Sequence, residues 1–146
     1  YSLVPAGRAG RFIKDQGVHR PWQSLTKSSP CFGRLRDTSH FHVDCENLYV
    51  PGLCGGLVLP LAEVPGEVEL SKYPILKALI GDGVGGLVEM ARQRDFVPDE
   101  AYSSPCDLCT HARLHLFRHS QESYLELGPK QFYEEASLPG FTRPER

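Results

Sequence analysis

Five cysteines in 146 residues constrain this chain more than any other feature. Three stand singly, at Cys31, Cys45 and Cys54, and two form a C-x-x-C pair at Cys106 and Cys109. An odd number argues against a closed disulfide framework and is typical of a reducing compartment in which thiols serve as ligands. We therefore expect a cytoplasmic protein that uses several of these thiols together.

The C-x-x-C pair lies in the stretch SSPCDLCTHARLHLFRH, at the start of a helix that Ser104 or Pro105 is expected to open. At a helix start both sulfurs can face one point, and the helix N-terminus favours thiolates. A redox dithiol would normally follow a buried strand, whereas this pair follows the polar loop DEAYSSP. The pattern favours a metal or cluster site, with a redox dithiol or two unrelated buried cysteines as alternatives.

Three histidines follow on the same helix, at His111, His115 and His119. The first and last are about 12 Å apart at a rise of about 1.5 Å per residue, so the three cannot converge on one ion. Arg113 and Arg118 interrupt them. We interpret this helix face as solvent- or partner-facing.

The segment HFHVDCENLYVPG predicts a β-hairpin. Glu46 and Asn47 suit its turn, because Asn tolerates a positive φ, and residues 48–50 form the second strand. The first strand should direct one set of side chains to a buried face: Phe41, Val43 and Cys45. Cys45 is then expected to be a small buried side chain rather than a ligand.

The opposite face of that strand carries His40, His42 and Asp44. This set matches the two-histidine, one-carboxylate composition of some iron oxygenase sites. Three alternate residues of one strand extend over about 12 Å, so they rarely provide all the ligands of one ion. We favour a polar sheet face and keep a hydrolase or oxygenase centre as the alternative.

The second half of the chain predicts helices. Ser71 should cap a helix that contains Pro74 in its first turn and ends at Gly81. A second helix has apolar residues at helical spacing, and a third is the cysteine-bearing one. The residues expected to be buried on these two are Val84, Leu87, Val88 and Ala91, then Leu108, Ala112, Leu116 and Phe117.

A short final helix is expected over PKQFYEEA, whereas residues 1–39 show no sustained period and predict an irregular lead-in with Phe12, Ile13 and Trp22 as anchors. The predicted fold class is therefore α+β: a small β-hairpin followed by three or four α-helices around a metal or cluster site made of four cysteines.

The charge is unevenly distributed. Residues 1–39 contain seven Lys or Arg and two acids, a net of +5, and the remainder contains nine and sixteen, a net of −7. Because the basic residues are scattered singly among Gly and Pro, we do not expect a nucleic-acid partner. No run of eighteen apolar residues is present, so we expect no membrane span.

Cys31, Cys54, Cys106 and Cys109 are the candidate ligands, drawn from a loop, the end of the hairpin and the helix start. Gly55 and Gly56 follow Cys54, where the backbone can approach a bulky group closely. Zinc ribbons usually contain two C-x-x-C knuckles, whereas one knuckle and two single cysteines resemble an iron–sulfur cradle more closely. Spacing leaves both metals open.

The order of a single Cys31, the hairpin HFHVDCENLYVPGLC and a later SPCDLC helix resembles the auxiliary-cluster region of radical S-adenosylmethionine enzymes, known as the SPASM or shorter twitch extension. HFHVD, YVPGLCGGL and YPILKAL also look like an uncharacterised bacterial branch. The resemblance covers about residues 30–136, with Asn47 at the position of the family's turn glycine. It implies a [4Fe–4S] cluster on Cys31, Cys54, Cys106 and Cys109.

The resemblance also implies a domain organisation. Residues 1–29 would be a basic lead-in or junction and residues 30–146 the cluster-binding domain. The C-x-x-x-C-x-x-C motif that binds S-adenosylmethionine in the family is absent from the sequence, and the chain begins with Tyr1 rather than Met. We therefore expect an upstream barrel domain as partner, with the present chain assisting electron transfer or substrate positioning and not being catalytic by itself. The alternative is a zinc-stapled structural or interaction module.

Overall fold

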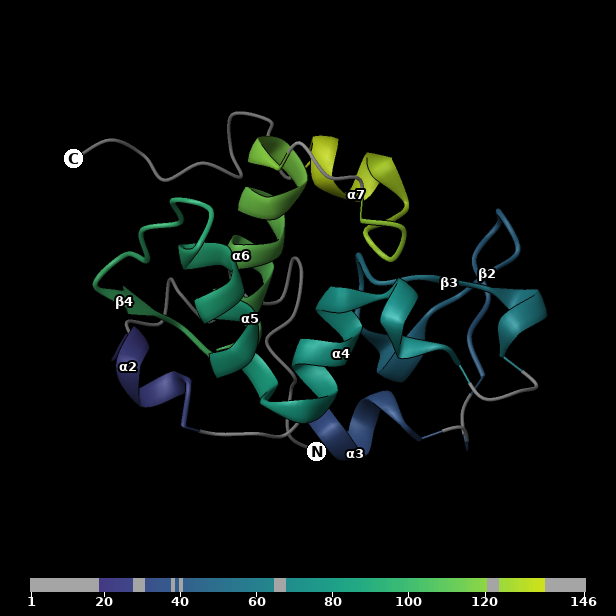
Figure 1. Cartoon of the computed structure of the whole chain (residues 1–146), viewed down its shortest axis with the longest axis horizontal. Coiled ribbons are helices and arrows are strands. Elements are labelled where there is room, and N and C mark those ends of the chain that lie inside the picture. The colour runs from purple at the N-terminus through teal and green to yellow at the C-terminus, as the bar shows by residue number, and fades with distance from the viewer. Residues whose placement is uncertain are drawn as a thin grey trace.

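The computed structural model describes residues 19–27, 31–37, 39, 41–64, 68–120 and 124–135. Within these ranges the chain has six α-helices and two small antiparallel sheets of two strands each. Figure 1 shows the longer helices α5 and α6 on one side and the short strands β2 and β3 on the other, with α4 between them. The predicted α+β class is confirmed.

Three helices make up the main apolar core: α4 (Pro74–Gly81), α5 (Gly83–Arg92) and α6 (Pro105–His119). Helix α5 packs against both α4 and α6. The predicted buried faces are confirmed, since at most 2% of each of these side chains is exposed: Val84, Leu87, Val88, Ala91, Leu108, Ala112 and Leu116. Phe117 is half-buried and stacks on Tyr133 of α7 (Lys130–Glu135), at 4.8 Å between ring centroids.

The start of α4 differs from the prediction. Ser71 does not cap it, because Ser71 lies in a preceding 3-10 turn, η3 (Leu70–Lys72), and donates to Glu69. Instead the buried carboxylate of Glu126 accepts the backbone N–H of Ile75 at 2.7 Å. A residue distant in the sequence therefore satisfies this helix N-terminus, and local cap rules could not identify it.

The described part of the lead-in is more regular than predicted. It contains α2 (Trp22–Leu25) and α3 (Cys31–Leu35), and β1 (Arg20–Pro21) pairs with β4 (Ala101–Tyr102). Leu25 and Leu35 are buried in the core. Helices this short offer no full period to detect, so their stabilisation comes from tertiary packing. The expected anchors Phe12 and Ile13 lie outside the described residues.

The predicted hairpin is reduced to one antiparallel bridge between Val43 and Tyr49. Asn47 has φ 60°, which confirms the left-handed turn residue. The main partner of β2 (Leu48–Tyr49) is a later strand, β3 (Leu59–Pro60).

The buried face predicted for this hairpin is wrong. Phe41 and Val43 are 52% and 41% exposed, and Cys45 is also exposed. A single bridge leaves no continuous sheet for these side chains to pack beneath. Phe41 instead stacks on Tyr49 at 4.8 Å between ring centroids.

Two further 3-10 turns complete the described elements, η1 (Pro51–Leu53) and η2 (Leu61–Glu63). Among the described residues, no helix combines the length and apolar character needed to cross a membrane.

Candidate functional site

Four of the five cysteines come from three separate segments of the structure. Cys31 begins α3, Cys54 directly follows η1, and Cys106 and Cys109 lie in the first turns of α6. All four are free thiols that are buried or partly buried. The fifth, Cys45, is exposed on the hairpin turn.

The four thiols are electrostatic neighbours. Burial, followed by the nearby Cys109, Cys54 and Cys106, raises the pKa of Cys31 to about 12. Burial also raises the pKa of Cys54 to about 11, where Cys109 and Cys106 act in the same direction. The pKa of Cys106 is raised by burial and then by Cys109. The structure therefore brings all four predicted site residues into one region.

A close backbone approach holds the first two thiols together. Gly52 in η1 has φ 57°, and a Cβ at this position would lie only 2.7 Å from the carbonyl oxygen of Arg34 in α3. A side chain here would clash with backbone and would also be strained at this φ. Gly52 thus lets the segment that carries Cys54 pack directly on the helix that carries Cys31.

A local hydrogen-bond network fixes the start of α6. The Ser104 side chain accepts the backbone N–H of Asp107 at 3.1 Å, which confirms Ser104 as the predicted N-cap. In return the Asp107 carboxylate accepts from the backbone N–H and hydroxyl of Ser103, at 2.9 and 3.0 Å. This reciprocal arrangement resembles a capping box and holds Cys106 and Cys109 on a fixed first turn.

The two glycines after Cys54 receive a protein side chain. A Cβ at Gly55 would lie 3.2 Å from the Phe132 ring, and one at Gly56 only 2.5 Å from it. The bulky group that approaches this bend is therefore the aromatic pair of α7, Phe132 and Tyr133. Tyr133 donates a short hydrogen bond to the carbonyl oxygen of Gly56.

Sequence reasoning missed Arg113. Its sequence context predicts a solvent- or partner-facing position, yet only 4% of the residue is exposed, and it lies one helical turn after Cys109. Its guanidinium lowers the pKa of Cys54 against the larger effect of burial. An arginine at i+4 from a cysteine of a C-x-x-C pair was the only available signal.

The four thiols do not converge on a single ion. Among the described residues, no three His, Cys, Asp or Glu side chains form a group that could hold one metal ion. A tetrahedral zinc site would place neighbouring sulfurs about 3.8 Å apart, given Zn–S bonds of about 2.3 Å. The four thiols are thus electrostatic neighbours that do not form a closed mononuclear site.

The histidines of α6 have separate structural environments. His111 lies 3.5 Å from Asp107 and packs edge-on against Tyr102. His115 is partly buried and its Nε2 lies 2.6 Å from the carbonyl oxygen of Arg94, so at this position the predicted solvent- or partner-facing helix face packs within the chain. These contacts explain two of the three histidines without a metal.

The alternative set on the hairpin is divided. Asp44 is a turn residue, since its Oδ1 accepts the backbone N–H groups of Glu46 and Leu48, each at 2.9 Å. His42 is exposed, and His40 lies outside the described residues. The Oδ1 atom of the carboxylate in this alternative set is therefore already engaged by backbone, whereas Oδ2 has no hydrogen-bond partner among the described groups.

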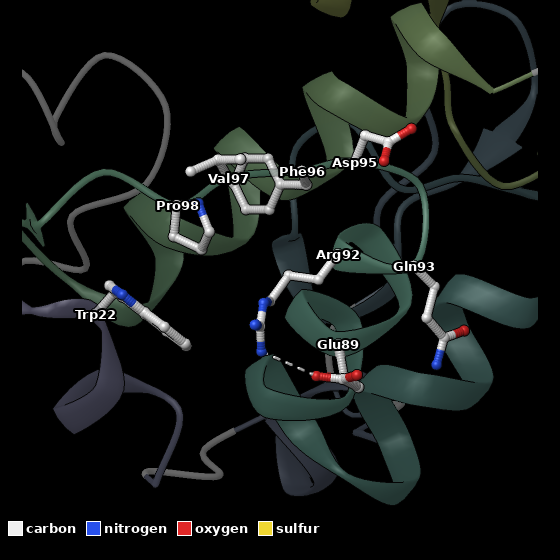
Figure 2. A pocket seen from close by; sticks show the side chains of 8 residues that line it. All are labelled: Trp22, Glu89, Arg92, Gln93, Asp95, Phe96, Val97 and Pro98. Atoms are coloured by element: carbon white, nitrogen blue, oxygen red, sulfur yellow. Dashed lines mark hydrogen bonds and ion pairs between the residues drawn. The ribbon is translucent and has the colours of Figure 1, made fainter.

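A surface hollow of about 520 Å³ lies elsewhere, between α2 and the end of α5 (Figure 2). The Arg92 guanidinium lies over the Trp22 ring, 5.6 Å from its centroid, and 3.3 Å from Glu89. The described lining residues include no cysteine or histidine. This hollow lacks the chemistry of the thiol region.

Comparisons with known proteins return no match to a family model, a curated protein or a solved structure.

Proposed function

We propose that Cys31, Cys54, Cys106 and Cys109 bind a [4Fe–4S] cluster and that this centre is the functional element of the chain. The observation that carries the proposal is that four thiols from three segments lie together in a partly buried region. Burial and the neighbouring cysteines raise the pKa of Cys31, Cys54 and Cys106, so these three thiols resist deprotonation without a cation. Metal binding removes that obstacle by replacing the protons.

The sequence pattern of one C-x-x-C knuckle and two single cysteines favours a cluster over zinc, because zinc ribbons usually contain two such knuckles. One ion draws four sulfurs to a small tetrahedron, whereas a four-iron cube takes one thiolate at each of four separated irons. Binding of zinc by the same four cysteines is the experimental outcome that would replace the cluster assignment.

The experiment is anaerobic reconstitution with iron and sulfide, followed by iron and sulfide analysis. We expect brown protein with about four irons and four sulfides per chain. Cys54→Ser and Cys31→Ser should lose most of this iron. Cys45→Ser is the matched control, because Cys45 is exposed on the turn, and it should load fully. Colourless protein with one zinc per chain, or iron loss in Cys45→Ser equal to that in Cys54→Ser, would overturn the cluster assignment.

We further propose, from the sequence resemblance, that the chain serves as an auxiliary-cluster domain of a radical S-adenosylmethionine enzyme in a reducing, cytoplasmic setting. In this role the cluster would relay electrons or hold substrate for an upstream barrel domain. The reconstituted chain without that domain should not cleave S-adenosylmethionine under reducing conditions. Formation of 5′-deoxyadenosine by this chain would refute the auxiliary role.

A further inference from the structure

Arg113 is a buried cation at the edge of the thiol region. Its Nη1 donates to the carbonyl oxygen of Gly55 at 2.9 Å and to the hydroxyl of Tyr133 at 3.1 Å. Its Nη2 contacts the Thr110 hydroxyl at 3.4 Å. One side chain of α6 is thereby tied to the bend after Cys54 and to α7.

The surroundings of this cation include two of the candidate ligands. Arg113 follows Cys109 by one helical turn, and its hydrogen bond to Gly55 ties it to the residue directly after Cys54. The guanidinium remains charged although it is removed from water, because arginine is not deprotonated in proteins. A buried charge without a full counter-charge is costly, and no described carboxylate forms an ion pair with it.

One donor of the guanidinium is unused. The Nε atom of Arg113 is buried and has no hydrogen-bond partner among the described groups. Buried donors in native proteins are paired with a protein group, an ordered water or a ligand, so Nε is a donor available to an acceptor that binds beside Cys109. A thiolate or sulfide of a bound centre would be both an acceptor and the missing negative charge.

We propose that Arg113 is a positioning residue for the metal centre, balancing the charge of the bound thiolates and donating a hydrogen bond from Nε to one of the centre's sulfurs. This inference rests on the proposed function. A cluster held by four thiolates is an anion, and one-electron reduction makes it more negative. A buried cation beside it stabilises the reduced form more than the oxidised form and so raises the reduction potential.

The test compares Arg113→Met with Arg34→Gln in the reconstituted full chain. Arg34 is the matched control, because it also acts on Cys54 and Cys31 but is exposed to solvent, where water and salt screen its charge. Arg113→Met should bind about four irons yet be at least about tenfold harder to reduce, a decrease of about 59 mV for a one-electron couple. Arg34→Gln should change the equilibrium constant for reduction of the cluster by less than about threefold. The measurement is a potentiometric titration followed by electron paramagnetic resonance.

Arg113→Lys keeps the charge without the planar fork and covers the case in which Arg113→Met does not fold. Arg113→Lys should reverse more than half of the decrease in reduction potential seen in Arg113→Met, and its resonance spectrum should differ from that of the wild type. Loaded Arg113→Met with the wild-type potential, or an equal decrease in Arg34→Gln, would overturn the role of Arg113 and leave the cluster intact. If Arg113→Met does not fold, an unchanged resonance spectrum in Arg113→Lys would overturn the hydrogen bond from Nε, because lysine keeps the charge and lacks the planar fork.

Wild-type protein that takes up neither iron nor zinc would refute the proposed function and this inference together. If the wild-type chain takes up zinc instead, the same argument applies, since zinc with four thiolates is also an anion. Arg113→Met should then bind zinc at least about tenfold more weakly in competition with a chelator, and unchanged affinity would reject the role.

Discussion

The helical core and the thiol region are stabilised in different ways. In the core, α4, α5 and α6 are helices of eight to fifteen residues whose apolar faces pack on one another. In the thiol region, the elements are strands of two residues, a helix of five and a 3-10 turn of three. Elements this short do not persist in isolation, so the thiol region depends on side chains that join its segments.

The two regions should depend on a bound metal to different extents. The core can form from apolar burial, which contributes about 25 cal/mol per Å². The thiol region brings four thiols and a buried arginine together and leaves the Nε donor of that arginine unpaired. Metal binding should therefore raise the stability of the thiol region more than that of the helical core.

The largest expected effect is that of metal loading. We expect the reconstituted protein to be more stable than the apo protein by several kcal/mol, since structural metal sites contribute directly to folding. Hydrogen exchange should show the gain in residues 31–37 and 48–60, with smaller changes in α5. Equal protection gains in both regions would show that they form one cooperative unit, and an absence of gain would contradict the division.

The next effect in size belongs to the core. Leu87 is completely buried on α5, and Leu87→Ala should lower the free energy of unfolding by about 2–5 kcal/mol. Val97→Ala is the control, because Val97 is 84% exposed and should change stability by less than about 0.5 kcal/mol. Both values come from urea denaturation. A cost below about 1 kcal/mol for Leu87→Ala would mean that α5 is not the centre of the core.

These two predictions correspond to what the sequence revealed and what it did not. Val84, Leu87, Val88 and Ala91 recur at i, i+3, i+4 and i+7, so the buried face of α5 could be predicted. The positions of Leu25 and Leu35 could not, because their helices have four and five residues and no period. Local pattern is informative only where an element is long enough to repeat it.

The same distinction applies to the candidate site. The four cysteines could be grouped from their types and spacing, and the structure places them as neighbours. Arg113 could not be identified as buried, since its burial depends on Gly55 and Tyr133, which are far from it in the sequence. Contacts between distant segments leave no periodic signal in either partner.

Glu126 links the two regions, because its backbone carbonyl oxygen also accepts the N–H of Val58 at 3.0 Å, next to β3, and it gives the third prediction. Its carboxylate accepts the backbone N–H of Ile75 from within the core, and Glu126→Ala should cost about 1–3 kcal/mol because that donor loses its buried partner. Glu126→Gln keeps an acceptor oxygen and should cost less. Thermal or urea unfolding of the three proteins at one pH tests the order.

Glu126 also predicts a pH dependence. Burial raises the pKa of this carboxyl above its ordinary value of 4.5, against the lowering effect of its backbone hydrogen bonds. The folded state therefore binds the proton more tightly than the unfolded state, so its contribution is fully present below pH 4.5 and declines as the pH rises through the raised pKa. Glu126→Gln should lack this decline. A wild-type stability that rises over the same interval more steeply than that of Glu126→Gln would contradict the assignment.

The smallest expected effect lies at the junction of the two regions, where α6 passes from the thiols into the core. Ser104 caps this helix, and Ser104→Ala should cost about 1 kcal/mol. Ser71→Ala is the matched control, since Ser71 precedes α4 without capping it and bonds only an exposed Glu69 side chain among its described contacts. Its cost should be below about 0.5 kcal/mol.

Because the Ser104 cap fixes the turn that carries Cys106 and Cys109, its loss should also weaken metal retention against a chelator, whereas Ser71→Ala should retain metal as the wild type does. Equal retention in both variants would show that the thiols are positioned by packing of the α6 body rather than by its first turn.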